Sequence, residues 1–256
     1  MTAVPALTVL GVSTPYPRPD APCSGYVVRA GARSLWVDAG SGTLGNLLRH
    51  VRLEDLSGIW LSHLHADHSA DLLTAYYALR FSELAPQRPI PVFGPRGWAE
   101  RMEHFLASDA PNPMAAVFDV HELDGAMTTT LDDTFALAAV PVAHNVPAFG
   151  LRVTFGDGTV FAYSGDTAPC PALAALAASA DLLLCEAGAP DRTREAAQGH
   201  SSPEGAAELA REARVRRLLL THLAPGSEAA DVARRAAAVF GAPVEVARTG
   251  QTFPIA

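Results

Sequence analysis

The chain has 256 residues, with 27 acidic and 19 basic side chains, and its formal net charge is −8. Hydrophobic residues make up 49% of the chain and charged residues 18%, which excludes a disordered or low-complexity protein. Every basic side chain is an arginine, so catalysis through a lysine Schiff base is excluded, and the acidic balance argues against nucleic acid as a partner.

Apolar runs bounded by turn residues predict strands with helices between them. In chain order, we expect strands at 8–12, 25–30, 34–40, 58–63, 135–144, 150–155, 159–166, 181–187 and 217–222. Helices are predicted at 71–84, 96–107, 171–179, 203–213 and 228–240. The proline-rich segments 15–22 and 86–95 and the segment 108–116 are expected to be surface loops. Two β-rich halves with interleaved helices indicate two sheets packed face to face under outer helices.

The cysteines and the N-terminus indicate the class of protein. Cys23, Cys170 and Cys185 show no paired spacing, so neither a disulfide framework nor a cysteine zinc ribbon is expected. The N-terminus lacks the basic start of a signal peptide, and no apolar run reaches the ~20 residues that span a bilayer. We therefore expect one cytoplasmic domain over 1–256, without a membrane partner. A homodimer is compatible with the sequence, which does not determine the oligomeric state.

Ionisable residues collect at or just beyond the carboxyl ends of the predicted strands. They are Asp38, His63, His144, Asp166, Glu186 and His222. Strands fix the positions of such residues while the following loops leave them accessible, so this placement predicts a site rather than a set of solvated turns.

The densest group is SHLHADH, residues 62–68. In extended chain His63 and His65 alternate and point to one side, and Asp67 and His68 follow after the chain turns. Imidazole and carboxylate together suit zinc or a similar divalent metal. The alternative is a histidine-rich surface loop.

The ligands near position 65 are too few to complete two metal sites, and three further residues supply the rest. We predict this metal-ligand set: His63, His65 and His144 around one ion, Asp67, His68 and His222 around the other, and Asp166 between them. Taken alone, His144 reads as a loop histidine and His222 as the end of a strand. Apart from His200, the other histidines receive no assigned chemistry: His50, His104 and His121.

At this point the sequence resembles the metallo-β-lactamase fold family. The motifs run along essentially the whole chain: TVLGV, the SGY hairpin, VDAG, SHLHADH, VAH, YSGDT, LLLCEA, GHSSPEGA and LLLTHLAP. The resemblance implies an α/β (α+β) fold, a four-layer αββα sandwich with metals at one edge of the sheets. True β-lactamases of this family use a cysteine in the second metal site, where this chain has Asp67, and Cys185 is expected in the core.

LLLCEA followed by GHSS resembles the ribonuclease Z and small-phosphodiesterase branch, and the overall likeness is closest to the atypical class II cyclic-nucleotide phosphodiesterases. This resemblance implies that His200 contacts the scissile phosphate or protonates the leaving oxygen, and that Glu186 orients it. The alternative is that His200 only precedes a helix as part of its cap. Ribonuclease Z carries a tRNA-gripping arm between the positions matching His144 and Asp166, and the 22 positions here leave no room for one.

We therefore predict a dinuclear-metal hydrolase that cleaves small or cyclic nucleotide phosphodiesters by attack of a metal-bridging hydroxide. Asp67 is expected to orient or deprotonate that nucleophile, with zinc as the predicted metal and manganese or iron as alternatives. Asp38 is a candidate partner for a ligating histidine. The roles of Tyr76, Tyr77, Arg80 and the loop 13–24 stay undetermined.

Other functions fit the same residues. One alternative is a lactone or thioester hydrolase, because the same nucleophile attacks carbonyl carbon. Others are a ribonuclease Z-like tRNA 3′ endonuclease that lacks the arm, and a non-catalytic binding protein stabilised by metal.

Overall fold

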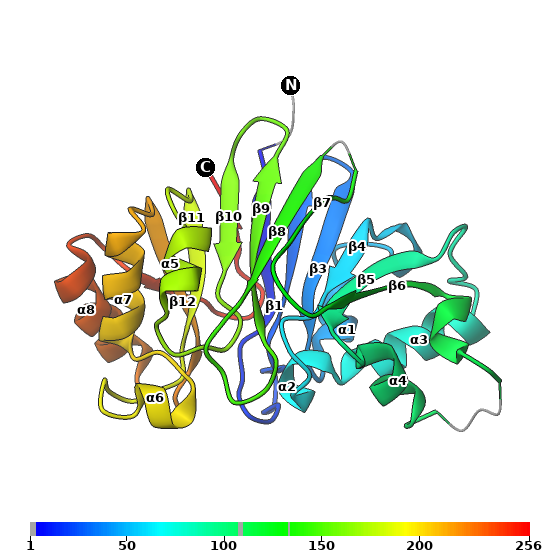
Figure 1. Cartoon of the computed structure of the whole chain (residues 1–256), viewed down its shortest axis with the longest axis horizontal. Helices are drawn as coiled ribbons and strands as arrows, with labels where there is room; N and C mark the ends of the chain where they lie inside the picture. Colours follow the sequence, from blue (N-terminus) through cyan, green and yellow to red (C-terminus); the bar gives the residue numbers. More distant parts are fainter. Residues whose placement is uncertain (1–3, 107–109, 133) are drawn as a thin grey trace.

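The computed structural model describes residues 4–106, 110–132 and 134–256. Two mixed sheets face each other and helices cover both outer faces, so the four-layer αββα architecture is confirmed (Figure 1). Across the described ranges, no helix is long and apolar enough to cross a membrane.

The first sheet combines the N-terminal strands with the last strand of the chain. Its order is β14 (Thr252–Pro254), β1 (Ala6–Gly11), β2 (Gly25–Ala30), β3 (Arg33–Ala39), β4 (Gly58–Trp60), β5 (Ile90–Pro95) and β6 (Phe118–Leu123). The predicted hairpin of β2 and β3 is antiparallel, whereas β3 to β6 pair in parallel. Their carboxyl ends therefore meet at one edge.

The second sheet has the same plan. Its order is β13 (Glu245–Val246), β12 (Arg217–Leu223), β11 (Leu182–Ala187), β10 (Val160–Tyr163), β9 (Phe149–Phe155), β8 (Phe135–Pro141) and β7 (Met127–Thr130). The antiparallel hairpin of β9 and β10 occupies the predicted positions, and β10 to β13 are parallel.

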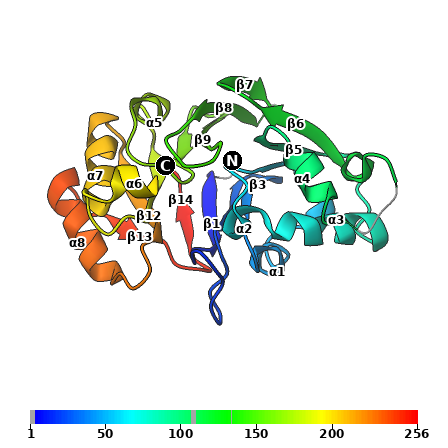
Figure 2. The ribbon, with the colours of Figure 1, turned by 60° about the horizontal axis from the view of Figure 1, so that its bottom comes forward.

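Helices of the N-terminal half cover the first sheet, and helices of the C-terminal half cover the second (Figure 2). The first set is α1 (Thr43–Leu47), α2 (Ala66–Ser69), α3 (Asp71–Phe81) and α4 (Trp98–Glu103), with 3₁₀ turns at Leu53–Asp55 and Pro113–Ala116. The second set is α5 (Pro171–Leu176), α7 (Pro203–Glu212) and α8 (Ala229–Phe240). The short helix α6 (Glu195–Gln198) buries none of its residues and lies in the connection before α7.

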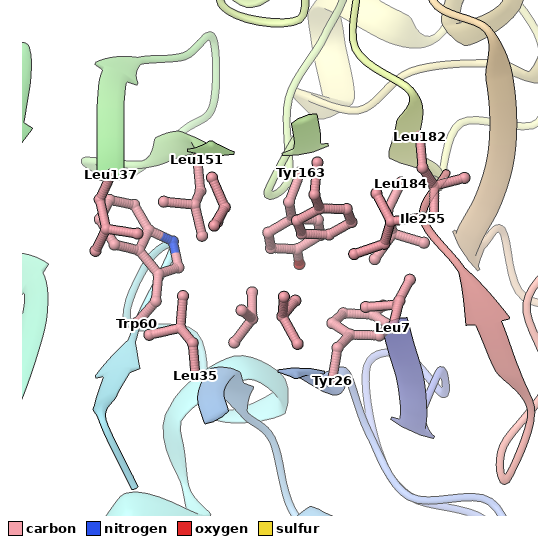
Figure 3. Packing of buried hydrophobic residues seen from close by; sticks show 14 of the residues in the cluster. Leu7, Tyr26, Leu35, Trp60, Leu137, Leu151, Tyr163, Leu182, Leu184 and Ile255 are labelled. Atoms are coloured by element: carbon pink, nitrogen blue, oxygen red, sulfur yellow. The ribbon is translucent and has the colours of Figure 1, made fainter. Parts of the chain in front are cut away.

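The alternation of side chains along each strand divides the core into layers. On β2, Tyr26 and Val28 enter the core between the sheets, while Val27 packs beneath the helices. From the opposite sheet, Leu182 and Leu184 of β11 also enter the core between the sheets, and Figure 3 shows the two inner faces meeting. Because successive strand residues point to opposite faces, apolar runs without alternation supply both layers.

The expected loop at 86–95 is wrong in its second half, because Ile90–Pro95 forms β5 between two parallel neighbours. Leu61 N donates to the carbonyl of Phe93 at 2.8 Å, so the odd-numbered residues of β5 direct their backbone groups toward β4. The β4 ladder pairs only with Val92 and Phe93, and Pro91 and Pro95 lie beyond it. Their missing N–H groups therefore interrupt no pairing on that side.

Other boundaries also differ from the expectation. The helix predicted at 96–107 forms as α4 over Trp98–Glu103, and position 107 lies outside the described residues. Of the loop predicted at 108–116, positions 108 and 109 also lie outside them, and Pro113–Ala116 is a 3₁₀ turn with Met114 buried. The short strands β7, β13 and β14 were not predicted, because each carries too few residues for a clear pattern. β6 was not predicted either, because Asp119, His121 and Glu122 break up its apolar pattern.

Candidate metal centre

The structure brings all seven predicted ligands together at the edge where the parallel strands end, near α2 in Figure 1. His63 and His65 follow β4, and Asp67 and His68 begin α2. The remaining three come from the opposite sheet: His144 follows β8, Asp166 follows β10 and His222 lies on β12. Parallel strands place their carboxyl ends side by side, so residues far apart in sequence meet here.

Local backbone geometry fixes these positions. A Cβ on Gly40 would lie 2.1 Å from the carbonyl oxygen of Asp67, so only glycine lets the start of α2 rest against the end of β3. Asp38 and His222 have left-handed φ values of 57° and 48°. Such backbone costs roughly 1 kcal/mol or more for a residue other than glycine, and it re-aims each side chain at the end of its strand.

One half of the centre contains His63, His65 and His144. His65 Nδ1 lies 3.0 Å from His63 Nε2 and 3.3 Å from His144 Nε2, and His63 Nε2 lies 3.6 Å from Asp166 Oδ2. His144 Nδ1 lies 2.8 Å from the Gly199 carbonyl oxygen, which directs Nε2 toward the other two rings.

The other half contains Asp67, His68 and His222. His222 Nε2 lies 3.4 Å from Asp67 Oδ2 and 3.3 Å from Asp166 Oδ2. His68 Nε2 lies 3.8 Å from Asp67 Oδ2 and 3.4 Å from Asp166 Oδ1. Both carboxylate oxygens of Asp166 therefore face the cluster, and this residue is shared by the two halves.

The donor atoms fit metal ions. In a tetrahedral zinc site with Zn–N of about 2.0–2.1 Å, ligand atoms are separated by about 3.3–3.4 Å, close to most of the separations above. His68 Nε2 and Asp166 Oδ1 are also buried without a hydrogen-bond partner among the described residues. A buried polar atom without a partner is costly, and a cation would satisfy both.

The carboxylate of Asp38 supports the second half of the centre. Its Oδ2 lies 2.7 Å from His68 Nδ1 and accepts hydrogen bonds from Tyr163 at 2.7 Å and from the Ser62 hydroxyl at 2.8 Å. Its Oδ1 accepts from the Ser62 backbone N–H at 2.7 Å. Because Asp38 engages Nδ1, the His68 ring is held with Nε2 toward Asp67 and Asp166.

The electrostatics differ across the cluster: the carboxylates favour positive charge on His68, whereas burial opposes it on His63. Burial lowers the pKa of His63 well below its usual value. Burial acts the same way on His68, but the carboxylates of Asp166 and Asp38 outweigh it and raise that pKa well above its usual value. Burial would raise the pKa of Asp166, yet His222, His68 and His63 hold it well below its usual range. Buried carboxylates that attract protons onto imidazoles will also attract cations.

Glu186 and His200 form a pair beside the cluster. His200 Nδ1 lies 3.0 Å from Glu186 Oε1, and the His200 ring lies 5.1 Å from that of His144 and 5.3 Å from that of His222. Glu186 is fully buried, which raises its pKa. Burial lowers the pKa of His200, but its bond to Glu186 outweighs burial and the net shift is upward.

The other residues singled out in the sequence lie away from the cluster. Tyr76 lies on the buried face of α3. Tyr77 packs on the ring of Phe81, and the Arg80 guanidinium lies over the same ring. Cys185 is buried in β11, as expected. The histidines left without a role are absent from the described metal-ligand groups: His50, His104 and His121.

Three supporting residues were not recognised in the sequence. Tyr163 lies in a segment that reads as an ordinary strand, Ser62 opens the histidine motif, and Thr14 donates to Asp67 Oδ2 at 3.0 Å from the loop 13–24. The only sequence signal is that Tyr163 and Ser62 adjoin the ligand motifs. Thr14 and Asp67 are 53 positions apart in the sequence, and Asp38 and Tyr163 are 125 positions apart. Contacts over such separations produce no local pattern in the sequence.

Comparison with known proteins identifies the family. The family described as Beta-lactamase superfamily domain matches residues 15–223. An uncharacterised protein of Mycobacterium tuberculosis is 37% identical over 97% of this chain and 92% of its own length. A ribonuclease Z of Mycobacterium sp. is 34% identical over 94% of this chain and 92% of its own.

Solved structures show the same fold. The metallo-β-lactamase fold protein YhfI of Bacillus subtilis superposes with a TM-score of 0.85 and 25% identity, covering 98% of this chain and 99% of its own. The short form of human tRNase Z gives 0.80 and 24%, again over 98% and 99%. Yeast PDE1 gives 0.74 and 13% over 98% and 99%.

The family and the His/Asp cluster together indicate binding of divalent metal ions. The chain belongs to the beta-lactamase superfamily, within which it is a metal-dependent hydrolase of the ribonuclease Z-like branch.

Proposed function

We propose that this protein is a dinuclear-metal phosphodiesterase acting on small or cyclic nucleotide phosphodiesters. The observation that carries the proposal is the Glu186–His200 pair at the rim of a cluster able to hold two cations. A histidine beside two metals suits reactions in which a leaving oxygen must receive a proton.

The seven clustered residues would hold the two ions, with Asp166 shared between them. Zinc is the proposed metal, because imidazole is the majority ligand and suits zinc. When bound, two such ions supply a hydroxide nucleophile at neutral pH and offset the charge that grows on the phosphoryl oxygens.

The chain's own residues orient the reacting groups. Glu186 Oε1 accepts from the backbone N–H groups of Thr167 at 2.9 Å and Ser201 at 3.0 Å, so the carboxylate cannot turn away from His200. With its Nδ1 engaged by Glu186, His200 keeps Nε2 for the leaving oxygen of the substrate. Asp67, whose Oδ2 accepts from Thr14, is the residue proposed to orient the nucleophile.

A tRNA 3′ endonuclease is the second candidate, favoured by 34% identity to a ribonuclease Z. Against it, β9 and β10 with their short turn fill most of the chain between His144 and Asp166. A thioester hydrolase is less favoured, because a thiolate leaves without the proton that the Glu186–His200 pair can supply. A lactone also releases an alkoxide, so the assay below separates a lactone hydrolase from a phosphodiesterase.

The test is hydrolysis by metal-loaded protein of 2′,3′- and 3′,5′-cyclic nucleotides, bis-p-nitrophenyl phosphate, a lactone panel and a 3′-extended tRNA. His200→Ala should lower phosphodiester kcat by about 10²- to 10⁴-fold with the metal content unchanged. His104→Ala is the matched control, because His104 is exposed and outside the cluster. Turnover confined to lactones, or to tRNA, would replace the proposal by the corresponding alternative.

A further inference from the structure

We propose that a cavity beside the metal centre binds a second phosphate group of the substrate through Arg18 and Arg248. The inference rests on the proposed phosphodiesterase function and specifies its substrate class: small nucleotide diesters that carry a phosphate in addition to the scissile one.

The cavity has a volume of about 380 Å³ and adjoins the metal centre. His222 lines it, and so does Thr14, whose hydroxyl donates to Asp67 Oδ2. It therefore opens onto the half of the centre formed by Asp67, His68 and His222. A cavity of this size falls within the range of roughly 300–1,000 Å³ typical of small-molecule sites.

Its walls come from both ends of the chain. The loop after β1 supplies Arg18, and the segment between β13 and β14 supplies Arg248. Figure 2 shows these two segments side by side, and the Gly250 N–H donates to the Val9 carbonyl oxygen at 2.8 Å. The third wall is the turn between β12 and α8, which includes Gly226.

The charge of the lining is opposite to that of the chain. Acidic residues outnumber basic ones by 27 to 19 overall, yet the described residues of the lining include two arginines and no aspartate or glutamate. Within the described ranges neither guanidinium forms an ion pair, and both side chains are exposed. Arg18 instead lies over the ring of Tyr16, 5.0 Å from its centroid. Two unpaired guanidinium groups at one cavity are an attractive site for an anion.

A second phosphate is the anion that best fits this arrangement. Cations in the centre would neutralise the scissile phosphate, so that group does not require the arginines. A guanidinium group can donate two parallel hydrogen bonds to two oxygens of one phosphate. The hydroxyls of Ser13 and Ser227 in the lining can donate further hydrogen bonds. Cyclic mononucleotides, which have a single phosphate, should therefore be poorer substrates than diesters with a terminal phosphate.

The experiment compares the dinucleotide ApA with its 5′-phosphorylated form pApA, which has the same scissile bond. Metal-loaded wild-type protein should prefer pApA in kcat/KM by about tenfold or more, since a charge-assisted contact has that effect. The Arg18→Gln/Arg248→Gln double variant should lose this preference through KM and keep its rate on ApA. Arg101→Gln is the matched control, because Arg101 is an exposed arginine of α4 outside the cavity.

Equal ratios of pApA to ApA in the wild type and the double variant would overturn the inference. If the wild type hydrolyses none of the diesters, cyclic nucleotides included, the phosphodiesterase proposal fails. Turnover of cyclic nucleotides with no preference for pApA in turnover or binding would instead overturn the inference alone. Calorimetric binding then tests the cavity separately, and pApA must still bind the wild type, but not the double variant, more tightly than ApA. Inorganic phosphate is the last arm: an effect on ApA turnover that requires both arginines, in protein that shows no preference for pApA, would assign the cavity to free phosphate and overturn the proposal.

Discussion

The two halves of the metal centre share Asp166 but are held in place by different means. In the half with His63, His65 and His144, two rings are half-buried, and His144 is oriented by a backbone carbonyl. In the half with Asp67, His68 and His222, the side chains are buried.

Side chains from both sheets support that second half. Asp38 of β3 holds His68, Tyr163 of β10 donates to Asp38 across the inner core, and Thr14 donates to Asp67. The difference indicates that the buried half is coupled to the stability of the fold, whereas the more exposed half depends on local loops. A substitution in the buried half should therefore lower both the stability of the fold and the affinity for metal.

Removing Asp166, which both halves share, should affect the two halves alike. In Asp166→Ala we expect both metals to be lost and hydrolysis to fall by on the order of 10³-fold or more, because transition-state stabilisation of several kcal/mol depends on the ions. Metal analysis and kcat/KM measure this. Asp157→Ala, at the exposed turn of the same hairpin, should behave as wild type. Full metal content in Asp166→Ala would contradict a shared ligand.

Substitution of one histidine in each half should lower the free energy of unfolding by different amounts. In metal-free protein, His68→Ala should lower the free energy of unfolding by about 3–5 kcal/mol, because it leaves the buried charge of Asp38 without its ion-pair partner. His65→Ala removes a half-buried ring and should cost within about 1 kcal/mol. Urea unfolding in the presence of a chelator compares them, and equal losses would remove the distinction.

Tyr163→Phe should weaken one ion selectively. The loss of the hydroxyl that donates to Asp38 should lower stability by about 1.5–3 kcal/mol and the affinity for one of the two metals by about tenfold. Tyr26→Phe is the control: its ring centroid lies 5.4 Å away, but its hydroxyl bonds to Thr221 instead. Competition titrations with a coloured chelator resolve the two sites, and equal weakening of both ions would show that Asp38 does not act through His68.

The smallest effect is expected for Thr14→Val. This change removes the donor to Asp67 and should weaken the same ion by less than tenfold, because a typical hydrogen bond contributes about 0.5–1.5 kcal/mol. Thr8→Val deletes a buried hydroxyl that bonds to Thr252, outside the cluster, and should leave both affinities unchanged. A larger effect than that of Tyr163→Phe would reverse the proposed ranking of the supports.

Local patterns in the sequence were enough to predict the layers and the cluster of residues at the edge of the sheets. Alternation at His63 and His65 and the position of Asp166 and His222 at strand ends are properties of short segments, and strand geometry carries them directly into space. The core strands were also predicted from local patterns, because a continuous apolar run such as the one around Leu183 is stable only when it is buried.

Only the tertiary structure decided what surrounds those clustered residues. The strand at Ile90–Pro95 depends on a short neighbour, β4, whose ladder does not reach Pro91 or Pro95. Tyr163 reaches Asp38 only because two sheets face each other. Arg18 and Arg248 approach one cavity from opposite ends of the chain. Such contacts depend on how twisted sheets pack and close, and no local periodicity encodes that packing.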